Sequence, residues 1–181
     1  EITNVKESFK NQNILDLFRF DKIKSITEYK FNGYNINFVY LPKNIEKIEY
    51  CAFYKNQIQI LDLSNCIKLK NIGENVFYEN KIKHLKLPDN IEEIYNYAFS
   101  INQIKILDLS NCIKLKEINS NVFYENPLTE IKILNDIKID YDNNYDYKND
   151  VWNKFVKYYH KNDKKAGDYK LENNKWQWYP L

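Results

Sequence analysis

The chain has 181 residues, which is enough for one domain to bury a core without disulfides or metals. Its 27 basic and 25 acidic side chains give a formal net charge of +2, so charge gives no reason to expect nucleic acid or a membrane surface as a partner. The 3 glycines lie too far apart for a phosphate-binding loop, and no apolar run reaches the roughly 18 residues that a membrane span needs. The aromatic content of 16% excludes a disordered chain, and a first residue of Glu1 rather than Met indicates a processed or trimmed product.

An internal repeat organises most of the chain. The segment AFYKNQIQILDLSNCIKLK, which starts at Ala52, recurs as AFSINQIKILDLSNCIKLK from Ala98, a shift of 46 residues. Each unit divides in two, because Leu61 and Leu85 are 24 residues apart and Leu85 and Leu107 are 22 apart. Extending this spacing in both directions predicts six strand cores, at 15–17, 39–41, 61–63, 85–87, 107–109 and 131–133.

A period of 22 to 24 residues with Leu-x-Leu, followed by Asn or Cys, is typical of leucine-rich repeats. One coil of such a repeat cannot bury its own apolar face, so neighbouring coils stack and their short strands form a parallel sheet. The predicted fold class is therefore α/β, as a right-handed leucine-rich repeat solenoid of about six coils with a parallel sheet on one face.

The repeat also predicts which side chains are buried. Leu61 and Leu63 point inward, and Asp62 between them points outward. After each strand comes a column whose asparagines are expected to bond turn backbone: Phe20, Asn44, Cys66, Asn90, Cys112 and Asp136. A second column is expected to fill the back of each coil, with Phe9 as its expected start: Phe31, Phe53, Phe77, Phe99 and Phe123.

The three cysteines are predicted to be free thiols. Coils stack at about 4.8 Å, so Cys66 and Cys112, two coils apart, are expected roughly 9.6 Å from each other. That separation exceeds the ~7 Å limit for a disulfide. Cys51 lies at a different phase of the coil, so it has no partner there either.

Two segments carry a family resemblance. LPKNIEKIEYCAFYKNQIQILDLS and LPDNIEEIYNYAFSINQIKILDLS resemble the BspA-like leucine-rich repeats of bacterial surface proteins, with shared Ile-x-x-x-Ala-Phe and Leu-x-Leu-Pro patterns. The resemblance covers about residues 14–136. It implies a secreted or surface-attached module that binds host or neighbouring-cell proteins.

The period is lost after Ile137, so we expect a solenoid over residues 1–137 and a C-terminal capping segment over 138–181. The first coil is degenerate and is expected to act as the N-terminal cap. Within residues 150–163, apolar side chains at i, i+3, i+4 and i+7 predict a helix with Asn149 or Asp150 as its N-cap. Residues 168–180 predict a hairpin around Asn173 and Asn174. Trp176 and Trp178 of this hairpin leave open a second interpretation, a glycan- or wall-binding unit.

Residues with catalytic or metal-binding chemistry are scarce. The 2 histidines, His84 and His160, form no recognisable set with Ser, Cys or Asp, so no enzyme is predicted. Asp140, Asp142, Asn144 and Asp146 match the first positions of a calcium loop. Because Tyr145 replaces the required Gly and Val151 the final Glu, a solvated loop is favoured, and no metal or cofactor is predicted.

The outward face of the sheet is the predicted site. One column of outward side chains alternates in charge from strand to strand, beginning at Asp62. This alternation indicates either salt bridges between neighbouring strands or charged contacts that set the register of a bound ligand. The neighbouring column is apolar on four of six strands, which indicates either a partner surface or simple copying by repeat duplication. The predicted protein-binding residues are Phe38, Tyr40, Ile60, Asp62, His84, Lys86, Ile106, Asp108, Glu130 and Lys132.

The function predicted from these features is a non-enzymatic protein-binding module. It is expected to be secreted or exposed on a bacterial surface and to mediate adhesion or host-protein binding through the sheet face. No nucleic-acid partner and no membrane insertion are expected. The alternatives are a structural scaffold or spacer, and glycan binding through the C-terminal aromatic residues.

Overall fold

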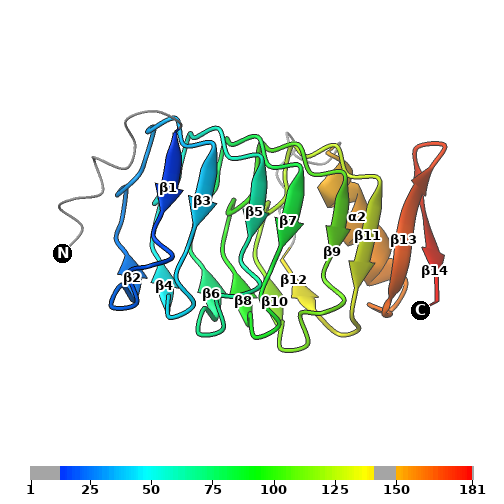
Figure 1. The fold of residues 1–181 in the computed structure, drawn as a ribbon. Helices are drawn as coiled ribbons and strands as arrows, with labels where there is room; N and C mark the ends of the chain where they lie inside the picture. The colour runs from blue at the N-terminus through cyan, green and yellow to red at the C-terminus, as the bar shows by residue number, and fades with distance from the viewer. Residues whose placement is uncertain (1–12, 141–149, 181) are drawn as a thin grey trace.

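The computed structural model describes residues 13–140 and 150–180, and it shows a solenoid closed at one end by a helix and a hairpin (Figure 1). Six short parallel strands lie along one face: β1 (Ile14–Asp16), β3 (Phe38–Tyr40), β5 (Ile60–Asp62), β7 (His84–Lys86), β9 (Ile106–Asp108) and β11 (Glu130–Ile133). Each begins one residue before its predicted core, so the predicted solenoid is confirmed. Phe9 and the calcium-loop residues Asp142, Asn144 and Asp146 lie outside the described residues.

A second row of strands forms the back of the coils: β2 (Ser25–Ile26), β4 (Lys47–Ile48), β6 (Asn71–Ile72), β8 (Glu93–Ile94), β10 (Glu117–Ile118) and β12 (Lys138–Ile139). Each ends in a buried isoleucine, which adds a third apolar column to the core. β6, β8, β10 and β12 form one parallel sheet, and β2 pairs with β4. Because β12 pairs with β10, the back sheet continues just past the expected boundary at 137, and the boundary itself stays a prediction.

The predicted phenylalanine column is confirmed as a continuous stack. Ring centroids of Phe31, Phe53, Phe77, Phe99 and Phe123 follow one another at 5.4, 5.4, 5.5 and 5.6 Å. The interplanar angle is 20° for the first pair and 6–7° for the others, so the rings lie nearly parallel from coil to coil. All five rings are buried, and this stack fills the back of the solenoid.

Buried asparagines that the sequence analysis missed run beside this stack. They follow four of the five phenylalanines, all but Phe31, by three positions: Asn56, Asn80, Asn102 and Asn126. Asn102 is typical, because its Oδ1 accepts from the Ile82 backbone N–H at 3.0 Å and its Nδ2 donates to the Phe77 and Phe99 carbonyls at 2.9 and 3.0 Å. Each such amide satisfies buried backbone groups in adjacent coils, which ties neighbouring coils together.

The predicted turn asparagines and free thiols are also present. Asn44 Nδ2 donates to the Asp21 carbonyl at 3.2 Å, and Asn90 Nδ2 donates to the Leu69 carbonyl at 3.0 Å. The three cysteines, buried at Cys51, Cys66 and Cys112, are all unbridged, which confirms that prediction.

The C-terminal segment caps the last coil with the predicted helix and hairpin. Helix α2 (Val151–Lys161) begins after Asp150, whose carboxylate accepts from the N–H groups of Trp152 and Asn153 at 2.8 and 3.3 Å. The same side chain accepts from Glu125 N–H at 3.1 Å and so joins the helix to the solenoid. Trp152 continues the aromatic stack, with its ring 5.0 Å from that of Phe123.

The hairpin extends the sheet face. β13 (Gly167–Glu172) pairs antiparallel with β11 and with β14 (Lys175–Tyr179). Asn173 and Asn174, with φ of 48° and 61°, form the two-residue turn, because asparagine tolerates the left-handed conformation that such a turn requires. The predicted hairpin is therefore confirmed, and it lies beyond β11 in Figure 1.

Candidate functional site

The sheet face is not continuous. Parallel ladders join β1 to β3, β5 to β7 and β9 to β11, but none joins β3 to β5 or β7 to β9 within the described residues. We call these two places the open junctions. Strands that share a ladder start 24 residues apart, whereas the strands at each open junction start 22 residues apart. Coil length therefore correlates with whether neighbouring strands pair.

The chain leaves the strand differently in the two coil types. In a 24-residue coil, the Asp62 carboxylate accepts from the Ser64 N–H at 3.0 Å and the Ser64 hydroxyl at 2.6 Å, and Leu63 N–H donates to the Lys86 carbonyl at 2.9 Å. In a 22-residue coil, proline stands in place of this serine, at Pro42 and Pro88. Proline has no N–H and restricts the residue before it to extended conformations, so this turn and its ladder bond cannot form in the same way.

A groove of about 900 Å³ lies at the β7–β9 open junction. Leu85, Leu87, Ile106 and Cys112 supply its apolar surface. Leu85 is only partly buried, although the equivalent inward residues of the neighbouring strands are about 1% exposed. At this junction, beside a missing ladder, a side chain that belongs to the core is accessible to solvent.

The rim of this groove carries charge of opposite sign at its two ends. Lys83 and Lys105 precede their strands, Asp108 is the last residue of β9, and Asp89 follows β7. None of these four side chains forms an ion pair with another described residue, although Asp108 accepts from the Ser110 hydroxyl at 2.6 Å. The groove is therefore electrically bipolar, with uncompensated cations at one end and uncompensated carboxylates at the other.

The structure brings together four of the ten predicted site residues. His84, Lys86, Ile106 and Asp108 line the groove. The remaining six lie on other strands: Phe38 and Tyr40 on β3, Ile60 and Asp62 on β5, and Glu130 and Lys132 on β11.

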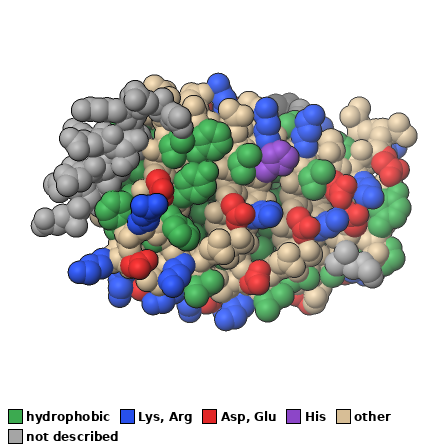
Figure 2. Space-filling model, viewed as in Figure 1, with side chains coloured by type: hydrophobic (Ala, Val, Ile, Leu, Met, Phe, Trp, Pro, Cys, Tyr) green, Lys and Arg blue, Asp and Glu red, His purple; other side chains and the backbone are tan. Residues whose placement is uncertain are grey.

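The charged column of the sheet face forms a visible row of alternating acidic and basic side chains (Figure 2). Lys86 pairs with Asp62 at 3.8 Å across the β5–β7 ladder. Lys132, however, pairs with Glu130 on its own strand at 3.7 Å and not with Asp108. The predicted salt bridge between neighbouring strands therefore forms between Asp62 and Lys86 only, and the Asp108 carboxylate at the groove has no ion-pair partner among the described residues.

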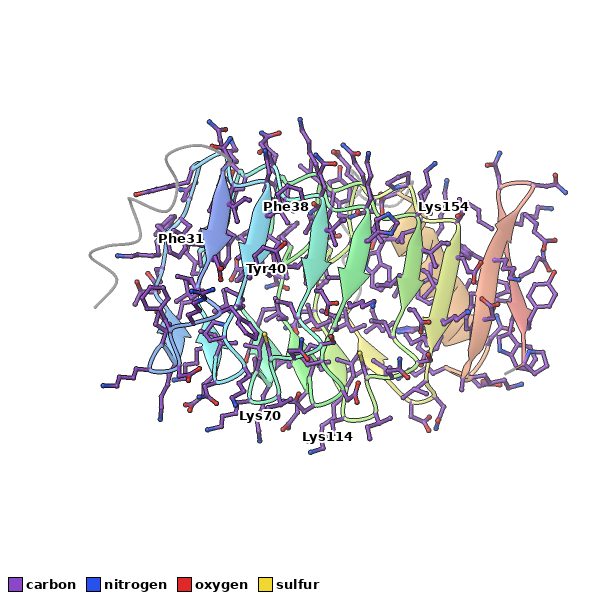
Figure 3. The ribbon with its side chains drawn as sticks, viewed as in Figure 1. Phe31, Phe38, Tyr40, Lys70, Lys114 and Lys154 are labelled. Atoms are coloured by element: carbon purple, nitrogen blue, oxygen red, sulfur yellow. The ribbon has the colours of Figure 1, made fainter. Side chains whose placement is uncertain are left out.

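The apolar column is exposed as predicted. The exposed fraction is 39% for Phe38, 52% for Ile60 and 56% for Ile106, whereas Ile14 is partly buried. Hydrophobic side chains gather over β1 and β3 (Figure 2), and Phe38 and Tyr40 project from β3 (Figure 3).

Two aromatic residues of the first coil, Phe18 and Phe20, are exposed and were not among the predicted binding residues. Their exposed fractions are 59% and 43%, so they add to the apolar end of the molecule. Exposed large apolar side chains in one region are typical of a partner surface.

Several groove residues were missed by the sequence analysis, among them Lys83, Leu85, Asp89 and Lys105. The usable signal was the alternation of 22- and 24-residue coils together with the Leu-Pro pair after the strand. That alternation was visible as a spacing, but its effect on strand pairing was not inferred.

The described residues offer little catalytic chemistry. Burial, with the nearby carboxylates of Asp89 and Asp108, raises the pKa of the Cys112 thiol to about 12, so the thiol is protonated at neutral pH and is not a nucleophile. Residues 13–140 and 150–180 contain no cluster of three His, Cys, Asp or Glu side chains that could hold a metal ion. In the same ranges no helix is long and apolar enough to cross a membrane.

The C-terminal tryptophans serve the cap. Trp176 is 4% exposed, with its ring 5.4 Å from that of Phe155 and its Nε1 donating to the Val151 carbonyl at 3.4 Å. Trp178 is partly buried and donates to the Ala166 carbonyl at 3.1 Å. Trp176 therefore has no free ring face on which a sugar could stack, and the glycan alternative rests on the partly buried Trp178.

Comparison with known proteins agrees with this architecture. The model of the BspA type leucine rich repeat region matches residues 4–68 and 24–150, in 6 copies. No curated protein and no solved structure matches the chain significantly. The matched family is associated with bacterial surface proteins, and leucine-rich repeat modules generally bind proteins. The matched residues include every strand from β1 to β12, and the chain belongs to the BspA-type leucine-rich repeat family.

Proposed function

We propose that this chain is a non-enzymatic protein-binding module, secreted or exposed on a bacterial surface, that mediates adhesion or host-protein binding through its sheet face. The observation that carries the proposal is the set of exposed apolar side chains on that face, foremost Phe38, Ile60 and Ile106. These side chains contribute little to the core, because the residues beside them in each strand point inward and fill it.

Burial of such side chains by a partner is favourable by about 25 cal/mol for each Å² of apolar surface removed from water. The charged side chains around them would then set the orientation of the partner rather than most of the affinity. Repeat duplication explains why Ile60 recurs as Ile106, but it does not explain Phe38 and Tyr40, whose equivalents 46 residues later are His84 and Lys86. The part of the apolar surface that Phe38 and Tyr40 form is therefore not a copy made by repeat duplication.

The test uses the whole chain as bait on a host-cell surface and matrix extract, beside an Ile60→Asp/Ile106→Asp variant. Captured proteins are identified by mass spectrometry and prepared pure, and their affinity for both baits is measured by calorimetry. We expect the variant to bind at least tenfold more weakly, because each new carboxylate loses hydration when the partner covers it.

A matched control is available within the same repeat. Ile67 and Ile113 are also 46 residues apart and are 64% and 72% exposed, but they lie in turns outside the sheet-face strands. Ile67→Asp/Ile113→Asp adds the same charge and is expected to bind like the native chain. Equal loss in both variants contradicts a sheet-face site, and absence of any purified binder favours the scaffold alternative.

A further inference from the structure

The groove at the β7–β9 open junction has the features of a site for one kind of protein segment. We propose that it binds an extended segment in which an acidic and a basic side chain, three positions apart, flank an apolar side chain. This inference rests on the proposed protein-binding function and specifies what the charged half of the sheet face recognises. Three properties of the groove support it.

The first property is an apolar surface that the fold leaves open. Leu85 is partly buried, Ile106 is 56% exposed, and the volume of about 900 Å³ lies within the range of roughly 300–1,000 Å³ that is common for ligand pockets. No side chain of the described residues fills this space. An apolar side chain of the ligand would cover Leu85 and restore the burial that the other inward strand residues have.

The second property is unpaired backbone. His84 N–H and the Lys86 carbonyl bond toward β5, and successive residues of a strand point their backbone groups to opposite sides. The N–H and C=O groups of Leu85 therefore face β9, and by the same alternation those of Ile106 face β7. Because no ladder joins these strands, such groups lack a ladder partner within the described residues. β7 and β9 have Cα atoms within 8 Å of each other, too close for a whole strand to enter between them, so only part of a ligand main chain can reach these groups.

The third property is the bipolar rim. Lys83 and Lys105 lie at the end where the strands begin, and Asp89 and Asp108 lie at the end where they stop. An extended chain rises about 3.3 Å per residue, so Lys105 and Asp108 are separated by about 10 Å along the strand. The main chain of an extended ligand with opposite charges three positions apart spans the same distance, and long side chains such as Glu and Lys reach the two ends of the groove although they leave the backbone on opposite faces.

The equivalent residues of the other open junction do not repeat this charge pattern. Counting back 46 residues from Lys83, Lys105 and Asp89 gives Asn37, Gln59 and Lys43. Of the four rim charges, only Asp108 has an equivalent of the same sign, Asp62, and that carboxylate is paired with Lys86. The bipolar rim is therefore a property of the β7–β9 junction and not of the repeat.

The probes are four capped octapeptides with Ser-Gly ends and the central sequences Glu-Leu-Ala-Lys, Glu-Leu-Ala-Glu, Lys-Leu-Ala-Lys and Gln-Leu-Ala-Gln. Their affinities for the whole chain are measured by calorimetry at low ionic strength, because salt screens charges beyond about 10 Å at 0.1 M. We expect Glu-Leu-Ala-Lys to bind at least tenfold more tightly than the other three.

A variant in which the charge at the basic end of the rim is reversed makes the test specific to the groove. Lys83→Glu/Lys105→Glu leaves both ends acidic, so the preference should move to Lys-Leu-Ala-Lys. The control Lys114→Glu/Lys154→Glu makes the same change of charge at two exposed lysines that do not line the groove (Figure 3), and it should keep the native preference. Far-ultraviolet circular dichroism confirms that all variants fold.

Two results overturn the proposal: native affinities for the four peptides within twofold of one another, or a preference that does not change in Lys83→Glu/Lys105→Glu. Either result leaves the proposed function intact if the purified partner still distinguishes Ile60→Asp/Ile106→Asp from its control. Conversely, peptide selectivity with no purified partner supports the groove alone and counts against the adhesion role.

Discussion

The two open junctions share the same backbone arrangement but present different side chains on the sheet face. Both join strands 22 residues apart, both have Leu-Pro after the first strand, and both present the same isoleucine and aspartate from the second strand. They differ on the first strand, where the face residues are Phe38 and Tyr40 in one and His84 and Lys86 in the other. The inward residue between them, Val39, is 6% exposed in the first junction, whereas its equivalent in the second, Leu85, is only partly buried.

This comparison separates two causes. The shorter coil and its proline prevent the ladder from forming, and this happens at both junctions. The face side chains differ at the two junctions: Phe38 and Tyr40 flank the buried Val39, whereas His84 and Lys86 flank the partly buried Leu85. The result is a sheet face with apolar side chains gathered over β1 and β3 and alternating charged side chains further along (Figure 2).

The largest expected effect tests whether the scaffold under the two junctions is the same. Asn56 and Asn102 occupy equivalent positions, and each accepts from an isoleucine N–H at 3.0 Å and donates to phenylalanine carbonyls. Replacing either by the similarly sized Leu leaves buried backbone groups without partners. We expect each variant to lose about 3 kcal/mol of unfolding free energy, measured by urea denaturation.

The exposed Asn65→Leu variant is the control for these substitutions and should change stability by less than about 0.5 kcal/mol. Losses for Asn56→Leu and Asn102→Leu that differ by more than about 1 kcal/mol would show that the two junctions rest on different scaffolds. The comparison of their face residues would then be invalid.

A second prediction converts one junction into the other. His84→Phe/Lys86→Tyr places the aromatic pair of β3 on β7, which should cover Leu85 and weaken binding of the Glu-Leu-Ala-Lys peptide at least tenfold in calorimetry. Because the Lys86–Asp62 pair is exposed, its loss should change stability by less than about 1 kcal/mol.

The reciprocal variant Phe38→His/Tyr40→Lys is the matched control. It alters the other junction, whose rim lacks the lysines, so peptide affinity should match that of the native chain. Weaker peptide binding in this control, or unchanged binding in His84→Phe/Lys86→Tyr, would contradict the assignment of the two outcomes to these side chains.

The smallest expected effect concerns the backbone of the coil that joins β7 to β9. Ile101 has a left-handed φ of 54°, which is costly for a β-branched residue, and its equivalent at the other junction is Lys55, with φ of 53°. Ile101→Asn should raise the unfolding free energy by about 0.5–1 kcal/mol, because asparagine tolerates this conformation. Urea denaturation measures the gain, and Lys55→Asn, without β-branching to relieve, should gain less. A loss of stability in Ile101→Asn would mean that side-chain packing outweighs backbone strain there.

The outward residues of the candidate site were predictable from the sequence, because alternation along a strand places Ile60, His84 and Ile106 on the face whatever lies around them. The groove was not predictable in this way. Lys83, Asp89 and Lys105 lie outside the strands, so no alternation rule assigns them a direction. Their meeting at one place depends on two coils that come together only through stacking.

The sequence by itself determined the solenoid, the phenylalanine stack, the free thiols and the helix-plus-hairpin cap, because each follows from local periodicity or from a repeat that must stack to bury its apolar side. Only the tertiary structure decided which neighbouring strands form ladders. Hydrogen bonding between coils depends on how the chain leaves each strand, and a difference of two residues with one proline shifts that path without changing the Leu-x-Leu pattern. The groove lies at one of the two junctions with this shifted path, where Leu85 and the rim charges reach the surface.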